Sequence, residues 1–157
     1  LMSAYFPDEY EPCAQNWATD YLNRPDVQKA IHVVGSVAWE DCSDKVGNLY
    51  NLTDVLSPMM PVYQQLIKSG AKLNILVYSG DDDAVCATLG SQQWIWDLGF
   101  NVTKNWTEWI LDGQVAGYST QFQGFSFATV HGAGHMVPQT RPEQSLVLFT
   151  LFLEGLA

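Results

Sequence analysis

The stretch LNILVYSGDDD, residues 73–83, decides the fold, because a short apolar run there leads directly into a tight acidic loop. The run from 73 to 78 lies between Gly70 and Gly80, which is typical of a β-strand buried on both faces. In open α/β sheets, reactive side chains gather on the loops beyond the carboxyl ends of strands, since those loops converge on one crevice. The three aspartates at 81–83 therefore mark one side of a candidate site.

A second loop of this kind has the sequence GAGHMVP, residues 132–138, and follows a strand pattern that ends at Val130. His135 comes after a Gly-x-Gly turn that lets the backbone approach a neighbour closely, and Pro138 stiffens the exit. An acid after one strand, followed later in the chain by such a histidine, reproduces the Ser-acid-His order of α/β-hydrolases. The acid would orient the imidazole and stabilise its charged form, so that the imidazole can take a proton from a nucleophile.

Hydrophobic spacing and breaker residues predict the remaining elements. Asn23 is expected to cap a short helix with Pro25 near its first position, and Gly70 suits the left-handed end of a second helix. With the two loops, this order is that of half a doubly wound α/β sheet. The predicted elements are an irregular arm over 1–20, helices over 25–32, 61–69, 92–98 and 142–154, and two or three strands between 106 and 130, broken at Asp112-Gly113 and Gly124.

The composition indicates one mixed α/β globular unit, with 157 residues, 47% hydrophobic and 13% aromatic. Seventeen acidic and seven basic side chains give a formal charge of -10, which argues against nucleic-acid and anionic-membrane partners. No apolar run approaches the roughly 20 residues that span a bilayer, and no signal-peptide pattern opens the chain. Because the chain starts at Leu1 and not at Met, we expect either a processed fragment or an artificial end.

Asparagine sequons and cysteines indicate the cellular compartment. Acceptor triplets for N-glycosylation begin at Asn51, Asn101 and Asn105, and three in a short chain favour the secretory pathway. The three cysteines are odd in number and widely spaced, so they form neither a Cys-x-x-Cys metal site nor a closed disulfide framework. In an oxidising compartment at least one of them must be free or paired outside this chain.

Two motifs carry a specific resemblance to a known family. Residues 78–83 resemble the Tyr-Ser-Gly-Asp-x-Asp loop of the serine carboxypeptidases, including the cathepsin A type, and residues 132–142 resemble their Gly-Ala-Gly-His-Met-Val-Pro-x-x-x-Pro segment. Residues 21–27 and 113–117 and the C-terminal helix are also similar. The resemblance implies that residues 1–157 are the C-terminal half, or small chain, of one α/β-hydrolase domain. Residues 1–60 would be an irregular arm and helices packing on an N-terminal portion outside this chain, and residues 61–157 would carry the sheet and both loops.

The resemblance also implies roles for single residues. Asp83 falls on the triad acid and His135 on the base, whereas Asp81 is a loop-building residue. Met136 falls where a residue lines the leaving-group pocket, and Cys86 where some members carry a free thiol beside the active site. For both, an ordinary buried side chain is the competing interpretation. Cys13 and Cys42 resemble cysteines that form disulfides with the N-terminal portion.

Several other polar residues are weaker candidates. Asp82 is expected to be an exposed surface charge, and the aspartate run lacks the spaced ligands of a calcium loop, so no metal site is predicted. His32 ends a predicted helix, and His131 holds a position that the family fills with other residues. Ser126 imitates a nucleophile elbow but lies in a strand pattern, whereas the elbow needs a strand-to-helix turn.

The resulting hypothesis is a serine-type carboxypeptidase that releases C-terminal residues from peptides through an acyl-enzyme, without a cofactor. Its partners would be a disulfide-linked large chain bearing the serine and peptide substrates, and a dimer of such two-chain units stays open. The expected location is the secretory pathway, ending in a lysosome or vacuole or outside the cell. Two alternatives remain: an acyltransferase or hydroxynitrile lyase on the same scaffold, and a non-catalytic binding or protective subunit.

Overall fold

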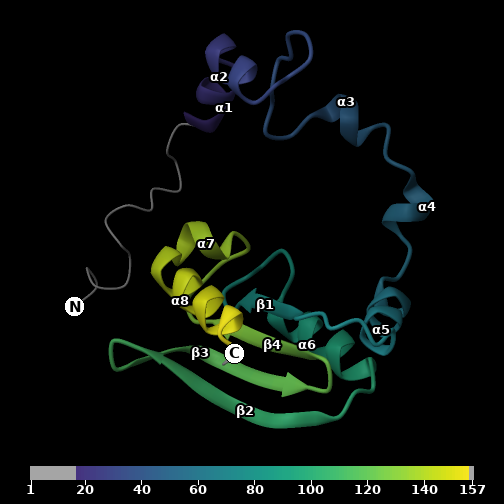
Figure 1. The fold of residues 1–157 in the computed structure, drawn as a ribbon, viewed down its shortest axis with the longest axis vertical. Coiled ribbons are helices and arrows are strands. Elements are labelled where there is room, and N and C mark those ends of the chain that lie inside the picture. Colours follow the sequence, from purple (N-terminus) through teal and green to yellow (C-terminus); the bar gives the residue numbers. More distant parts are fainter. Residues whose placement is uncertain (1–16, 156–157) are drawn as a thin grey trace. The chain divides into compact units, whose positions relative to one another are not determined.

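The computed structural model describes residues 17–155, and the chain divides into one compact unit up to Ser57 and another from Pro58 (Figure 1). Helices make up the first unit, whereas the second combines helices with a sheet. In chain order the elements are α1 (Trp17–Leu22), α2 (Pro25–Ala30), α3 (Asp44–Gly47), α4 (Leu52–Val55), α5 (Met60–Lys68), β1 (Leu76–Gly80), α6 (Thr88–Asp97), β2 (Val102–Leu111), β3 (Gln114–Phe122), β4 (Phe125–Val130), α7 (Val137–Thr140) and α8 (Pro142–Leu153).

The side chain of Asn23 joins α1 to the loop that follows α2. Its amide nitrogen donates to the carbonyls of Thr19 and Trp39, and its oxygen accepts from the Trp39 N–H, all at 2.8 Å. The predicted capping role of Asn23 is therefore wrong: Arg24 precedes α2 and makes no side-chain cap. Helix α1 also lies in part of the predicted irregular arm, whose sequence shows no steady helical period.

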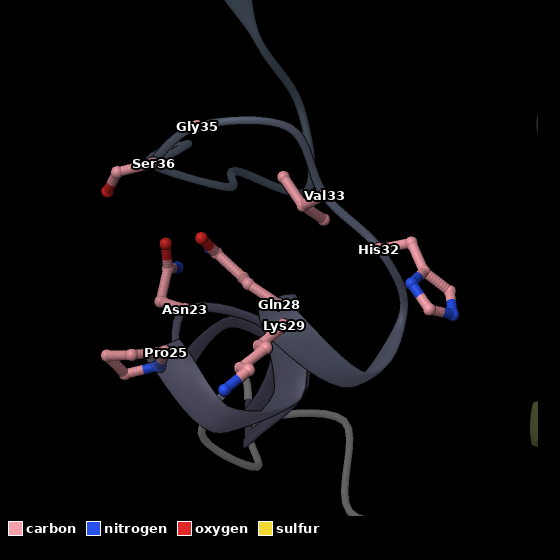
Figure 2. A pocket seen from close by; sticks show the side chains of 8 residues that line it. All are labelled: Asn23, Pro25, Gln28, Lys29, His32, Val33, Gly35 and Ser36. Carbon is pink, nitrogen blue, oxygen red and sulfur yellow. The ribbon is translucent and has the colours of Figure 1, made fainter.

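A hollow of about 460 Å³ in the first unit is lined by Asn23 and Gln28, whose side-chain amides both bond backbone carbonyls. Gln28 is 8% exposed, and its amide nitrogen donates to the carbonyls of Leu22, at 3.0 Å, and Val37, at 2.7 Å. Figure 2 shows Asn23 and Gln28 pointing toward the loop around Gly35, with His32 turned away from them. Because both amides bond the chain's own backbone, they fasten this loop to the helices.

The second unit holds a four-stranded sheet with the strand order β1-β4-β3-β2. Strands β2, β3 and β4 pair antiparallel as a meander, and the β2–β3 turn has positive φ at Asp112 (51°) and Gly113 (73°). That backbone suits the tight hairpin turns that Asp-Gly favours. The predicted breaks at Asp112-Gly113 and Gly124 are thus confirmed, and the region contains three strands.

Parallel pairing of β1 with β4 positions the candidate site. The register runs without interruption from Leu76 opposite Ser126 to Gly80 opposite Val130. Since both strands run in the same direction, their carboxyl ends lie at one edge of the sheet. The next residues along the two strands, Asp81 and His131, therefore begin two neighbouring loops.

Two hydrophobic clusters cover opposite faces of the sheet. Because successive side chains of a strand point to opposite faces, Phe125 and Phe127 of β4 join the cluster packed by α5 and α6. Ala128 and Val130 join the other cluster, which includes Val137 of α7 and buried side chains of α8. The second unit is therefore a sheet between two helical layers, as expected for a doubly wound α/β fold.

Some predicted boundaries and burial differ from the structure. The strand predicted over 73–78 is shifted toward the carboxyl end, since β1 spans Leu76–Gly80, and Tyr78 on it is 47% exposed. Within the described residues β1 is an edge strand, and its burial is incomplete: Leu76 and Val77 pack against opposite clusters, but Tyr78 does not meet the expectation of a buried strand. Helix α6 begins four residues earlier than predicted, and the short helix α7 was not predicted. Among the residues that the structure describes, no helix is long and apolar enough to cross a membrane.

Replacing Gly117 by alanine should destabilise the sheet. A Cβ there would overlap the Thr129 carbonyl and the Trp109 indole nitrogen, which donates to that carbonyl at 3.0 Å. We expect Gly117→Ala to lower the free energy of unfolding by about 1–3 kcal/mol, as overpacked cores do. Urea unfolding of the complete protein measures this.

Gly90→Ala is the matched control, because a Cβ on Gly90 of α6 meets nothing within 4 Å. Alanine favours helix over glycine by up to about 1 kcal/mol, so this variant should not lose stability. Equal stabilities of the two variants would contradict the packing assignment at Gly117.

Candidate active site

His135 and Asp83 meet at the carboxyl edge of β1 and β4. Asp83 lies in the loop after β1, and His135 lies in the loop between β4 and α7. Nδ1 of His135 is 3.0 Å from Oδ2 of Asp83. Because an ionised carboxylate only accepts hydrogen bonds, Nδ1 carries the proton, and in the neutral ring Nε2 is the basic nitrogen. The sheet thus brings the predicted acid and base together, with Nδ1 of His135 facing the carboxylate.

Asp83 is held by its own loop. Its Oδ1 accepts the backbone N–H groups of Val85, at 2.7 Å, and Cys86, at 3.0 Å. The Asp83 side chain is only 5% exposed, whereas the His135 side chain is 49% exposed. The pair therefore consists of a fixed, covered carboxylate and an imidazole whose far side is open to a reactant.

The pKa of Asp83 is lowered from its ordinary value of 3.8. The largest cause is the Cys86 N–H bond, followed by the hydrogen bond from His135, while burial acts in the opposite direction. Hydrogen bonds to the ionised form favour that form. Asp83 is therefore a carboxylate across the neutral and mildly acidic range, as an imidazole-orienting group requires.

Glycine lets the two loops touch. A Cβ on Gly80 would overlap the backbone carbonyls of Ala133 and Gly134, so only glycine fits this approach. The backbone N–H of Asp82 donates to the Ala133 carbonyl at 3.0 Å. The backbone N–H of Asp81 donates to the Val130 carbonyl at 3.1 Å. These contacts continue the sheet pairing beyond the ends of the strands.

A second His–Asp pair links the same loops. Asp81 Oδ2 lies 2.7 Å from Nδ1 of His131, and Asp81 Oδ1 accepts the N–H of Gly132 at 2.6 Å. The sequence predicted a loop-building role for Asp81 but no role for His131. The strand register could have indicated this pair, because Gly80 lies opposite Val130 and the residues that follow them become neighbours.

Those of the other predicted site residues that the structure describes are exposed. Cys86 is exposed and contacts Asp83 through its backbone N–H, and Met136, next to His135, is 59% exposed. Their expected roles in substrate binding stay predictions. Cys42 is exposed in the first unit, whereas Cys13 lies outside the described residues. The sequon asparagines Asn51, Asn101 and Asn105 are all exposed.

The weaker candidates do not join the pair. Asp82 is exposed, Ser126 lies inside β4, and His32 belongs to the first unit. Asp81 and Asp83 turn their carboxylates toward different histidines. Over residues 17–155, no three His, Cys, Asp or Glu side chains gather as a metal-ion site would need.

Comparisons with known proteins agree on one family. The model of the serine carboxypeptidase family matches residues 2–155. Two relatives from Arabidopsis thaliana are serine carboxypeptidase-like 22, 39% identical over 96% of this chain and 33% of its own length, and serine carboxypeptidase-like 29, 41% identical over 98% and 32%. The chain therefore spans about a third of the length of these curated relatives.

A solved structure gives the fold. The chain is similar to Kex1(Δ)p, a prohormone-processing carboxypeptidase from Saccharomyces cerevisiae, with a TM-score of 0.72 and 23% identity. The match covers 96% of this chain and 36% of that one. The predicted fold class is thereby confirmed: the mixed sheet and its helical layers are part of an α/β-hydrolase fold.

The lowered pKa of Asp83 predicts a pH-dependent contribution to stability. A carboxyl group whose pKa is lower in the folded state stabilises that state above its unfolded pKa, and loses this contribution as pH falls through the folded pKa. The stability difference between wild type and Asp83→Asn should therefore be largest above about pH 5 and shrink as pH falls below 3.8.

Urea unfolding of the complete protein at a series of pH values measures this difference. Asp82→Asn removes a neighbouring exposed carboxylate and corrects for the change in net charge. A difference for Asp83→Asn that grows toward low pH, relative to this control, would contradict the assignment.

Proposed function

The chain belongs to the serine carboxypeptidase family, and from this we propose that it supplies the acid, Asp83, and the base, His135, of a Ser-Asp-His triad. The serine would come from the remaining two thirds of the protein, which we call the serine-bearing portion. The observation that carries the proposal is the 3.0 Å bond between a covered carboxylate and the Nδ1 of a half-exposed imidazole.

The proposed reaction removes one residue from the carboxyl end of a peptide. Nε2 of His135 takes the proton of the serine hydroxyl while the serine oxygen bonds to the scissile carbonyl carbon. His135 then gives that proton to the leaving amine, the C–N bond breaks, and an acyl-enzyme remains. In the second half, His135 takes a proton from water, the water oxygen replaces the serine oxygen, and the serine regains its proton.

The orientation of the His135 ring supports the proton transfers proposed for its Nε2. Asp83 accepts from Nδ1, so Nε2 is the nitrogen left to exchange protons, and the imidazolium formed in the reaction faces a carboxylate at 3.0 Å. Because two backbone N–H groups also hold Asp83, the carboxylate keeps its place while the charge on the ring changes. A fixed charge that needs no rearrangement is what stabilises a transition state well.

The two edge strands of the described sheet differ in regularity, and this difference supports the proposal that the serine-bearing portion completes the sheet. Pairing of β2 with β3 is irregular between Val102 and Lys104, between Lys104 and Thr107, and between Trp109 and Ile110. Such bulges twist an edge and discourage further pairing. Strand β1 pairs regularly with β4, and within the described residues its other side is open. We infer that the sheet continues beyond β1.

An apolar groove beside β1 supports the same inference. It measures about 420 Å³ and is lined by β1 and α8, together with Pro138. Leu146 and Phe149 of α8 are 66% and 54% exposed, and the buried hydroxyl oxygen of Ser145 has no hydrogen-bond partner among the described residues. Exposed large apolar side chains around a groove are typical of a surface that another polypeptide covers. The serine-bearing portion is the proposed occupant.

The proposed compartment is the secretory pathway, with a lysosomal, vacuolar or extracellular destination. The exposure of Asn51, Asn101 and Asn105 leaves all three sequons accessible to glycosylation. Cys42 is exposed and has no partner cysteine among the described residues. We propose that Cys42 and Cys13 form disulfides with the serine-bearing portion, while Cys86 stays a thiol near Asp83.

Replacing His135 by alanine tests the proposed function. In the complete protein we expect His135→Ala to lower kcat for release of a C-terminal residue from a blocked dipeptide by several orders of magnitude. His32→Asn is the control, because it removes an exposed histidine of the first unit and asparagine tolerates the positive φ of 59° there. This control should keep wild-type activity, whereas near-normal turnover by His135→Ala would refute the role of His135.

The same assay separates the alternatives. Wild-type protein that transfers an acyl group from a glucose ester but does not hydrolyse the dipeptide would be an acyltransferase, and cleavage of a cyanohydrin would identify a lyase. Protein inert in these assays and toward a fluorophosphonate, which acylates activated serines, would be a non-catalytic subunit.

Alkylation of the unreduced protein tests the disulfides. Iodoacetamide should modify Cys86, which we propose to be a thiol, but not Cys42, although both are exposed in this chain. Peptide mass spectrometry should find Cys42 joined to a peptide of the serine-bearing portion. Alkylation of Cys42 before reduction would contradict the proposed bridge.

A further inference from the structure

The Asp81 carboxylate holds the start of the loop that carries His135. Each of its oxygens meets a different residue there: Oδ1 accepts the Gly132 N–H at 2.6 Å, and Oδ2 lies 2.7 Å from Nδ1 of His131. Both bonds cross from the loop after β1 to the loop after β4. Asp81 thus ties together the two segments whose ends carry Asp83 and His135.

His131 is also fixed through its backbone. Its N–H donates to the carbonyl of Ala116 at 2.8 Å, and its carbonyl accepts from Nε of Arg141 at 3.3 Å. Arg141 is 9% exposed and lies between α7 and α8. His131 is therefore bonded to β3, to the α7–α8 junction and, through its side chain, to Asp81.

The side chain of His135, the proposed base, is held by fewer hydrogen bonds than that of Asp83, the proposed acid. Asp83 is held within its own loop by Val85 and Cys86. The side-chain bond that the structure shows for His135 is the one to Asp83, and this imidazole is half-exposed. The direction of the ring toward the reacting hydroxyl therefore depends on how firmly the backbone of its loop is held against the Asp83 loop.

We propose that Asp81 and His131 are positioning residues for the reaction, because their bonded pair fixes the His135 loop against the Asp83 loop. This inference rests on the proposed function of His135 as the base. It predicts a specific kinetic signature: disturbing the pair should misplace the base and lower kcat, while KM changes little because neither residue is assigned to substrate binding.

His131→Leu and His131→Gln separate bonding from bulk. Leucine fills space but cannot donate, so we expect kcat to fall about tenfold, with the remaining Gly132 bond limiting the loss. Glutamine carries an amide donor, so His131→Gln should keep most of the wild-type kcat. Because the His131 side chain is 52% exposed, both variants should fold.

Asp81→Ala removes both bonds and should lower kcat about 100-fold, the size of effect that a misplaced catalytic group produces. Asp82→Ala is the matched control, since it deletes the exposed neighbouring carboxylate and should leave kcat unchanged. All variants are assayed in the complete protein for peptide hydrolysis and for the rate of inactivation by a fluorophosphonate. Thermal unfolding checks that each variant is folded.

The outcomes separate this inference from the proposed function. Loss of activity in His135→Ala, together with wild-type kcat in folded His131→Leu and Asp81→Ala, would overturn the positioning role alone. Equal losses in His131→Leu and His131→Gln would also overturn it, because the donor would then be irrelevant. If His135→Ala keeps normal activity, the proposed function itself fails. A graded fall in kcat, rescued by glutamine, would support the inference.

Discussion

The parallel pairing of β1 with β4 is the constraint on which the site depends. The register that places Gly80 opposite Val130 sets Asp81 beside His131 and brings Asp83 within 3.0 Å of His135. A slip by one residue would turn every side chain of β1 to the other face of the sheet. The fold and the candidate chemistry are therefore fixed by the same backbone hydrogen bonds.

Sequence patterns predicted the structure correctly where a local motif and a general rule of α/β folds indicated the same feature. Asp112-Gly113 and Gly124 marked the strand ends correctly, and the rule that reactive groups follow strand ends selected the loops of Asp83 and His135. Patterns failed where a partner far along the chain decides the outcome. Asn23 resembles a cap, but its amide bonds Trp39, sixteen residues away, and Tyr78 belongs to an apolar run but lines the open groove beside α8.

The contact between Gly80 and the backbone at Ala133 and Gly134 shows why the site needs small residues next to reactive ones. Glycine at position 80 lets the main chains approach closely enough for side chains of ordinary length to meet. The interaction of His131 with Asp81 could not be read from composition or spacing, because it requires the strand register to be known first. Neighbouring pairs of this kind become visible only in the folded chain.

The strand order has a consequence for how the molecule acquires its chemistry. Strands β2, β3 and β4 follow one another and pair as neighbours, whereas Asp83 and His135 are separated by 52 positions. Contacts between distant residues close large loops and form slowly compared with local hairpins. The meander pairs segments that are neighbours in the chain, whereas the contact between Asp83 and His135 requires the pairing of β1 with β4. Contact between Asp83 and His135 is consequently expected to form later than the local hairpins of the meander.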